Sequence, residues 1–350
     1  MKPVFYSNLI LRLVICITLY ACKTTNTTST PLQEKSLNLT EATSPIKLND
    51  SQNKFYKDIP YGELKENVFD IFLPASKHPS SLVIYVFGGG FIRGNQAQPY
   101  NAGGPLINAL LSKNIAYASI NYRYLSDDGQ GVFKCFNDVI KGLQFIRYHS
   151  KELNIDKTNI VLMGGSAGAG TSLWIGFHDD MADKKNIDPV LRESTRLKGM
   201  VAIETQANYD ILDWHNSVFS EYNSKGLDQK SVIRLGTAER IATFFGFKNL
   251  NNADSKASKE VRDKLNMLKL MSSDDPEIYV ENVKQAYSIP IALVPLQHHP
   301  LHAKALMDRA KETHVKGTFN IPAMNIDTRN GENAEGFITC LLYTSPSPRD

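Results

Sequence analysis

The sequence predicts an α/β protein in which a mainly parallel central sheet carries helices on both faces and an inserted cap. Two apolar runs, residues 81–87 and 197–204, are nearly continuous, which is typical of strands buried on both faces. Such runs alternate along the chain with segments whose apolar residues recur at helical spacing. A Gly-x-Ser-x-Gly sequence at residues 164–168 joins a third apolar run, residues 159–163, to a segment of helical pattern. This alternation predicts a parallel sheet covered by its connecting helices.

The predicted elements follow one another in a regular order. Strands are predicted over residues 67–74, 81–87, 115–121, 159–163, 197–204, 277–281 and 318–324. Helices are predicted over residues 105–113, 133–153, 169–177 and 300–314, the last beginning at a proline, which suits the first helical position. Residues 209–270 carry broken helical patterns and are too long for a plain connection, so we predict a cap there.

The composition is that of an ordinary globular protein. The chain has 350 residues, of which 42% are hydrophobic and 21% charged, enough apolar material for one large core. The formal net charge of +3 is too small to favour nucleic acid as a partner. We therefore expect no nucleic-acid binding.

The pattern of the first residues is typical of an export signal. Positive residues flank an apolar stretch that is too short for a good transmembrane span. It ends in Leu19-Tyr20-Ala21-Cys22, which resembles the lipobox of bacterial lipoproteins, where the cysteine is lipidated. The alternative is a secretory signal peptide cut nearby. We predict a signal peptide over residues 1–21, a flexible tether over residues 22–53, and attachment to a bacterial cell envelope by a lipid on Cys22 alone.

The last residues, 340–350, resemble a translated transposase adapter from a sequencing library. We predict that they are foreign to the gene, that the gene is truncated near Thr339, and that the folded domain covers residues 54–339. Of the four cysteines, only Cys135 then remains in this domain, so no internal disulfide is expected. Cys135 lies in a helical apolar pattern and is predicted to be a small core residue.

The Gly-x-Ser-x-Gly sequence has the context that a nucleophile elbow needs, a strand before it and a helix after it. Gly164 and Gly168 leave room for the strand and the helix to approach each other. The sharp turn lifts the Ser166 hydroxyl above the sheet edge and points the amide of Ala167 at the same spot. Ser166 is therefore the candidate nucleophile.

Three motifs together resemble the α/β-hydrolase superfamily, most of all the carboxylesterases with an H-G-G-G oxyanion motif and their feruloyl- or acetyl-xylan-esterase-like relatives. They are Gly88-Gly89-Gly90-Phe91, Asn121-Tyr122-Arg123-Tyr124 and Gly164-Gly165-Ser166-Ala167-Gly168. The resemblance implies that Ser166 is the nucleophile and that the amides of Gly89, Gly90 and Ala167 form the oxyanion hole. Phe87 lies where the motif has histidine. Because that histidine mainly supports the loop and backbone amides stabilise the oxyanion, we expect the oxyanion hole to survive with altered loop packing.

The position of the catalytic histidine differs from the family pattern. The segment after residue 324, where this fold places its histidine, contains none, and Glu335-Gly336-Phe337 occupies the expected place. A serine hydroxyl needs a base, and His298 or His299 at the entry to the helix 300–314 lies at the sheet edge of the elbow. A helix N-terminus also favours the neutral imidazole. We prefer His298, because His299 precedes Pro300 and is expected to occupy the N-cap position.

The sequence also offers candidates for the orienting acid and for a metal site. Glu281 and Asp210 follow strands, and Asp210 is our choice. His298, His299 and His302 have a spacing that could hold zinc, but no carboxylate lies at useful spacing from them. The glycines after the strand 81–87 lack the G-x-G-x-x-G pattern of dinucleotide sites. No metal and no cofactor are expected.

The leading hypothesis is an exported serine esterase that cleaves a carboxylic ester, small or linked to a polysaccharide, through an acyl-enzyme on Ser166. Trp214, Phe219 and the pair Phe244–Phe245 are candidate walls of its substrate site. The alternative is a non-catalytic, surface-tethered binding protein that kept the fold and lost its histidine. Phe87 favours that alternative, whereas Ser166 and its glycines favour the enzyme. A third hypothesis places the missing histidine downstream of the truncation.

Overall fold

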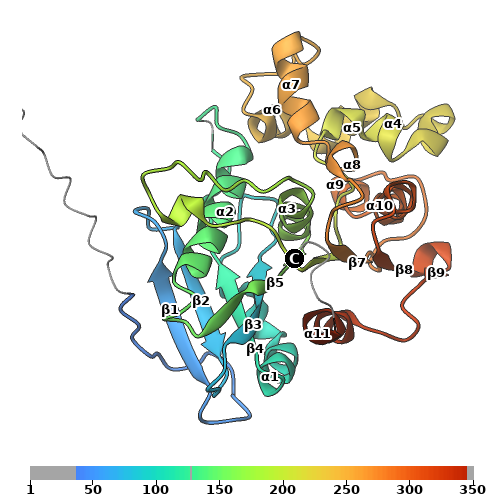
Figure 1. Ribbon diagram of the computed structural model, residues 1–350. Helices are drawn as coiled ribbons and strands as arrows, with labels where there is room; N and C mark the ends of the chain where they lie inside the picture. The colour runs from blue at the N-terminus through green and yellow to red at the C-terminus, as the bar shows by residue number, and fades with distance from the viewer. Residues whose placement is uncertain (1–36, 127, 345–350) are drawn as a thin grey trace, which may run out of the picture. The chain divides into compact units, whose positions relative to one another are not determined.

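A computed structural model describes residues 37–126 and 128–344 of the chain. Within them, one sheet runs in the order β1-β2-β4-β3-β5-β6-β7-β8-β9 (Figure 1). Its strands are β1 (Lys54–Pro60), β2 (Val68–Leu73), β3 (Ser80–Val86), β4 (Ile115–Ile120), β5 (Ile155–Gly165), β6 (Gly199–Ile203), β7 (Glu277–Glu281), β8 (Gly317–Ile321) and β9 (Ile326–Asp327). The pairs from β4 through β3, β5, β6 and β7 to β8 are parallel, while β1, β2 and β9 join antiparallel. The predicted mainly parallel sheet is confirmed.

Helices cover both faces of this sheet. One core cluster joins the sheet to α2 (Phe133–Tyr148), α3 (Ala167–Gly176) and α10 (Pro300–Thr313), and the other joins it to α1 (Gly104–Ser112) and α11 (Ala334–Thr344). Along β5, Leu162 belongs to the first cluster, while Val161 and Met163 belong to the second. Because side chains alternate between the faces of a strand, a continuous apolar run feeds two cores at once.

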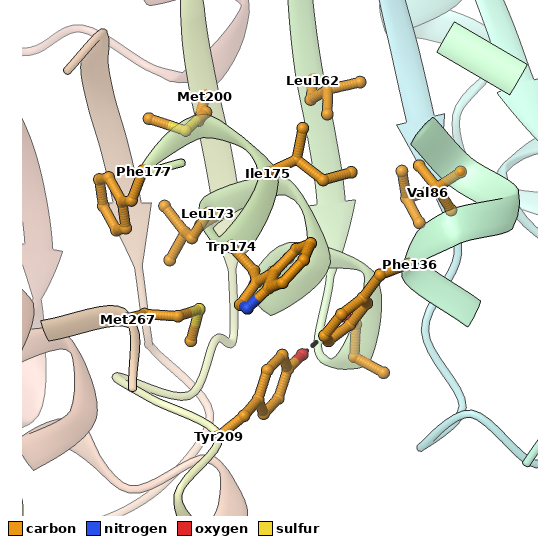
Figure 2. Packing of buried hydrophobic residues seen from close by; sticks show 14 of the residues in the cluster. Val86, Phe136, Leu162, Leu173, Trp174, Ile175, Phe177, Met200, Tyr209 and Met267 are labelled. Atoms are coloured by element: carbon orange, nitrogen blue, oxygen red, sulfur yellow. Dashed lines mark hydrogen bonds between the residues drawn. The ribbon is translucent and has the colours of Figure 1, made fainter. Parts of the chain in front are cut away.

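The helix α3, which follows Ser166, is supported by stacked aromatic rings (Figure 2). Phe136 of α2 stacks on Trp174 of α3, with ring centroids 4.5 Å apart, and on Tyr209, at 5.7 Å. The Tyr209 hydroxyl donates a hydrogen bond to the carbonyl oxygen of Ala167 at 2.8 Å. These contacts fix the first turn of α3 between the core and the start of the cap.

The cap lies between β6 and β7, where the long connection was predicted. It consists of η3 (Ile211–Asp213), α4 (Trp214–Ser217), η4 (Ser220–Lys225), α5 (Gln229–Gly236), α6 (Ala238–Phe245), α7 (Lys256–Lys264) and α8 (Met267–Leu270). Capping side chains mark where four of these helices begin. Asp228, Thr237, Ser255 and Asn266 each accept a hydrogen bond from a backbone amide in the first turn of the helix that follows.

The folded domain includes residues before the predicted start at residue 54. Ala42 donates a backbone hydrogen bond to Phe55, and the Asn108 side chain bonds the backbone of both Lys47 and Asn49. Ile46 also packs against the second core cluster. Residues 37–53 are therefore attached to the domain by specific contacts, which a composition poor in periodic apolar residues did not reveal. The predicted signal peptide, Cys22 and the rest of the predicted tether lie outside the described residues.

The predicted end of the domain at residue 339 falls inside a helix. α11 continues through Cys340 to Thr344, and Leu341 and Leu342 are buried in the second core cluster. The foreign origin of residues 340–350 stays a prediction. Among the described residues, no helix has the length and apolarity that crossing a membrane requires.

Candidate active site

Ser166 lies on a strained turn between β5 and α3. Its backbone has φ 53° and ψ −118°, in a region that residues with a side chain rarely occupy. Its amide donates to the carbonyl oxygen of Ile203, the last residue of β6, at 2.8 Å. The turn therefore holds Ser166 at the carboxyl ends of two neighbouring parallel strands, as a nucleophile elbow does.

Close backbone contacts explain the two outer glycines of the elbow. A Cβ atom on Gly168 would lie 1.9 Å from the carbonyl oxygen of Val86, and one on Gly164 would lie 2.3 Å from the carbonyl carbon of Gly168. At Gly165 the nearest atom would be the Tyr85 hydroxyl, at 3.4 Å. The fold needs glycine at positions 164 and 168, but it has room for a methyl group at position 165.

We expect Gly168→Ala to lower the free energy of unfolding by about 3 kcal/mol or more, because its methyl group would overlap backbone atoms of β3. The matched control, Gly165→Ala, is expected to stay within about 1 kcal/mol of the parent chain. Urea denaturation of both variants measures the difference. Equal effects of the two substitutions would show that the elbow is not packed as described.

His298 is the histidine that contacts Ser166. It lies between α9 (Leu293–Gln297) and α10, and its Nε2 is 2.8 Å from Ser166 Oγ. Burial and the nearby positive charge of Lys284 lower the pKa of His298 to about 4. The imidazole is therefore neutral near pH 7 and can accept the hydroxyl proton, as a general base must.

The other two histidines of the cluster have structural partners. His299 caps α10 as predicted: its Nδ1 accepts from the amide of Leu301 at 3.1 Å, and its Nε2 lies 2.9 Å from the Ser288 carbonyl oxygen. His302 is fully buried, with Nδ1 accepting from the Ala207 amide and Nε2 close to the Leu296 carbonyl oxygen. In residues 37–126 and 128–344, no group of three or more His, Cys, Asp or Glu residues could hold a metal ion.

Asp210 is engaged elsewhere. Both of its carboxylate oxygens accept hydrogen bonds from the Arg262 guanidinium, at 2.7 and 3.1 Å, inside the cap. No hydrogen bond of the described part of the chain joins Asp210 to His298. Glu281 likewise serves its own neighbours, accepting from the Tyr279 hydroxyl and the Asn320 side chain. The role of Asp210 as the orienting acid therefore gains no support from these contacts and stays a prediction.

Glu204 is a carboxylate that the sequence analysis did not single out. It directly follows Ile203, whose carbonyl oxygen binds the Ser166 amide, and it has a positive φ of 53°. Its Oε1 accepts from the amides of Val283 and Lys284, at 2.8 and 3.0 Å. Its Oε2 is buried without a hydrogen-bond partner among the described residues. Burial raises the pKa of Glu204. The signal in the sequence was a carboxylate at the end of an otherwise apolar strand.

The glycine loop after β3, Gly88–Gly90, lies beside Ser166. Gly89 and Gly90 have positive φ angles of 107° and 63°, and they line the same cavity as Ser166, Ala167 and His298. No hydrogen bond within the described part of the chain occupies the amides of these two glycines. Those amides are therefore available to an oxygen atom of a bound substrate.

Phe87 supports this loop at the position of the family histidine. Its buried ring stacks on Tyr122, with centroids 4.2 Å apart and planes inclined by 11°. The Tyr122 hydroxyl donates to the Phe87 carbonyl oxygen at 2.8 Å, and the Gln98 side chain accepts from the Gly88 amide at 3.1 Å. An aromatic stack and a glutamine thus hold the loop.

A cavity of about 380 Å³ opens over Ser166, between the glycine loop, the cap and α9. Trp214 and Phe244 line it, as predicted for the walls, whereas Phe219 and Phe245 lie in the core outside the lining. The other apolar lining residues include Phe91, Tyr209, Ile241, Leu293 and Leu296. The segment 335–337 does not line the cavity: Glu335 pairs with Lys113, and Phe337 packs on Tyr279.

The sheet order, the elbow and the cap define an α/β-hydrolase. Solved structures agree with this fold: a truncated carbohydrate esterase from gut microbiota (TM-score 0.57, 16% identity, 88% of this chain and 99% of that chain) and esterase B from Lactobacillus rhamnosis (0.53, 15%, 79% and 76%). A bifunctional GH43-CE protein of Bacteroides eggerthii also matches (0.56, 18%, 82% and 37%).

Residues 69–294 match the BD-FAE family, and the chain belongs to this family of carboxylesterase-like α/β-hydrolases. It is also 28% identical, over 185 residues, to the probable isoprenylcysteine alpha-carbonyl methylesterase ICMEL1 of Arabidopsis thaliana. The aligned part is 52% of this chain and 36% of that relative, so the chain spans about a third of the relative's length. His298 lies just beyond the family match.

Proposed function

We propose that this chain is a serine hydrolase that cleaves carboxylic esters through an acyl-enzyme on Ser166. The observation that carries the proposal is the 2.8 Å contact between Ser166 Oγ, on a strained elbow, and the Nε2 of a neutral His298. A weak nucleophile becomes active when a base stands within hydrogen-bond distance of it. The esterases among the similar proteins support the same class of reaction.

The proposed reaction has two halves. Ser166 Oγ attacks the ester carbonyl carbon while its proton passes to His298 Nε2, and the carbonyl π electrons move to the oxygen. When the tetrahedral intermediate collapses, the bond to the alcohol oxygen breaks, and the alcohol leaves with the proton from His298. Water then attacks the acyl-enzyme, again losing a proton to His298, and the acid is released with Ser166 restored.

The amides of Gly89, Gly90 and Ala167 are proposed to bind the negative oxygen of each intermediate. They belong to the cavity lining around Ser166, and the N-terminus of α3 adds a positive dipole end at Ala167. Donors placed in advance cost no reorganisation during the reaction, and each typically contributes about 2.7–4 kcal/mol to lowering the barrier. The cap, which begins beside Tyr209, is proposed to cover the acyl or alcohol group of the substrate.

Glu204 and Asp210 are the two candidates for the carboxylate that positions His298, and one pair of variants distinguishes between them. We expect Glu204→Gln to lower kcat by about 10²-fold or more at unchanged stability, because Glu204 adjoins the elbow and has a free oxygen. Asp210→Asn should instead lower the free energy of unfolding by about 3 kcal/mol, because it leaves Arg262 without its buried partner. Steady-state kinetics and urea denaturation measure both. The reverse pattern would assign the role to Asp210.

The proposal as a whole is tested with the purified full chain on aryl acetates, alkyl ferulates and acetylated xylan. We expect release of acid from at least one ester class, with a burst of alcohol if deacylation is slow. A folded chain that hydrolyses none of them would contradict the proposal and would favour the non-catalytic binding protein.

Export and lipid attachment at Cys22 are also part of the proposal, carried by the lipobox-like sequence Leu19-Tyr20-Ala21-Cys22. Expression in a bacterium fed with labelled fatty acid tests it. Label in the parent chain but not in Cys22→Ala is expected. Equal labelling of both, or of neither, would show that Cys22 carries no lipid.

A further inference from the structure

Two arginines reach the cavity from segments far apart in the sequence. Arg93 follows the glycine loop, and Arg240 lies in the first turn of α6 in the cap. The Nη2 atom of Arg240 is 2.6 Å from the place where a Cβ atom of Gly90 would be, and the Cγ atom of Arg93 is 3.0 Å from the corresponding place at Gly89. The two side chains therefore flank the glycine loop that faces Ser166.

Neither arginine has a counter-ion in the part of the chain that the structure describes. Within residues 37–126 and 128–344, no ion pair or side-chain hydrogen bond engages the guanidinium of Arg93 or Arg240, and the cavity lining contains neither aspartate nor glutamate. Two other arginines show the usual arrangement: Arg123 is paired with Asp138, and Arg262 with Asp210.

This arrangement is unfavourable in the protein alone. Arg240 is partly buried, and both burial and the charge of Arg93 lower its pKa. A partly desolvated cation beside a like charge is stabilised only when an anion is supplied. Because the pair faces a cavity that also holds the nucleophile, the anion that fits is a group on the substrate.

We propose that Arg93 and Arg240 bind a carboxylate on the substrate, so that the enzyme prefers esters that carry a second, negatively charged group. This inference rests on the proposed esterase function. A guanidinium presents paired N–H donors that match the two oxygens of a carboxylate, and such charge-assisted hydrogen bonds are among the strongest in proteins. The aromatic walls, among them Trp214 and Phe244, accommodate the apolar body that links the carboxylate to the ester.

The test uses two pairs of rigid esters whose members differ only in charge. Phenyl 4-carboxybenzoate and phenyl 4-carbamoylbenzoate place the group on the acyl side, and 4-acetoxybenzoate and 4-acetoxybenzamide place it on the alcohol side. We expect a preference of about tenfold or more in kcat/KM for the charged member of at least one pair, which decreases as salt is added. The pair that shows the preference identifies the side of the ester that faces the arginines.

Arg240→Gln and Arg93→Gln should each bring this ratio close to one. Arg234→Gln is the matched control, because Arg234 is exposed on α5 and does not line the cavity, and it should leave the ratio unchanged. Equal kcat/KM for both members of both pairs, or a ratio that survives both cavity substitutions, would overturn the inference while leaving the esterase function intact.

A binding measurement separates this inference from the proposed function. If no ester is hydrolysed, the esterase proposal fails, and calorimetric titration with 4-hydroxybenzoate and 4-hydroxybenzamide still decides the role of the arginines. Binding of the carboxylate alone, lost in Arg240→Gln, supports the anion site. Equal binding of the two compounds, or no binding of either, overturns it.

Discussion

Replacing Ser166 by alanine is expected to lower kcat for ester hydrolysis by on the order of 10⁴–10⁶-fold. The substitution removes the only atom that the proposed mechanism bonds to the substrate, Oγ. It leaves the Cβ atom that sets the strain of the elbow, so the backbone at φ 53° should be retained. Initial rates on the aryl acetate that the parent enzyme hydrolyses fastest, compared at equal concentrations of folded protein, measure the effect.

Ser172→Ala is the matched control. Ser172 is buried in the same helix, and its hydroxyl donates to the Gly168 carbonyl oxygen at 2.9 Å, away from the cavity lining. It should cost about 1 kcal/mol of stability and little activity. If Ser166→Ala hydrolysed esters as fast as Ser172→Ala, the nucleophile would have to be another group.

Replacing His298 by alanine is expected to lower kcat by a similar factor, because the serine then has no proton acceptor at 2.8 Å. The pH dependence of the parent enzyme provides an independent signature. An imidazolium cannot take the serine proton, so activity is lost as the pH falls through the pKa of His298. With that pKa lowered to about 4, kcat/KM should stay level between pH 7 and 5 and fall near pH 4.

The charge of Lys284 provides the control for that assignment. Lys284→Gln removes a positive charge that disfavours the imidazolium, so it should move the fall in kcat/KM to higher pH, while Lys284→Arg should not. The backbone amide of Lys284, which bonds Glu204, is kept in both. A fall in kcat/KM near pH 6.5 that is the same in the parent enzyme and in both Lys284 variants would exclude His298 as the titrating base.

Loss of folding must be distinguished from loss of the base in these profiles. Burial lowers the pKa of His302 to about 3, as it lowers that of His298. The unfolded chain therefore binds more protons than the folded one below about pH 6.5, and stability falls as the pH falls through that range. Circular dichroism at each pH shows which points still report on folded enzyme.

The parts of the fold that the sequence predicted are those set by local pattern. The elbow could be located because a strand, Gly-x-Ser-x-Gly and a helix are contiguous, and the paired faces of β3 and β5 followed from their apolar runs. β1 was missed because charged residues interrupt its alternation on an edge strand. The placement of His298 depended on topology: a helix that follows β7 starts at the same edge where β5 ends.

The carboxylate that orients His298 could not be predicted from the sequence, because its identity depends on side-chain contacts that a sequence pattern does not encode. Asp210 follows a strand, as predicted, but both of its carboxylate oxygens accept hydrogen bonds from Arg262, 52 residues further along the chain. The sequence predicted Glu204 as the last residue of a strand. Its positive φ, which turns the chain away from the strand, cannot be predicted from the residue type. The two cavity arginines likewise come together only through the fold of the cap.

Reaction of the full chain with a fluorophosphonate probe decides whether His298 activates Ser166. The probe reacts with serines that a base and an oxyanion hole have activated. Peptide mapping should find one adduct, on Ser166, which is absent from Ser166→Ala and greatly slowed in His298→Ala. A folded chain without an adduct would show that Ser166 is not activated, and an adduct that forms equally fast in His298→Ala would show that His298 is not its base.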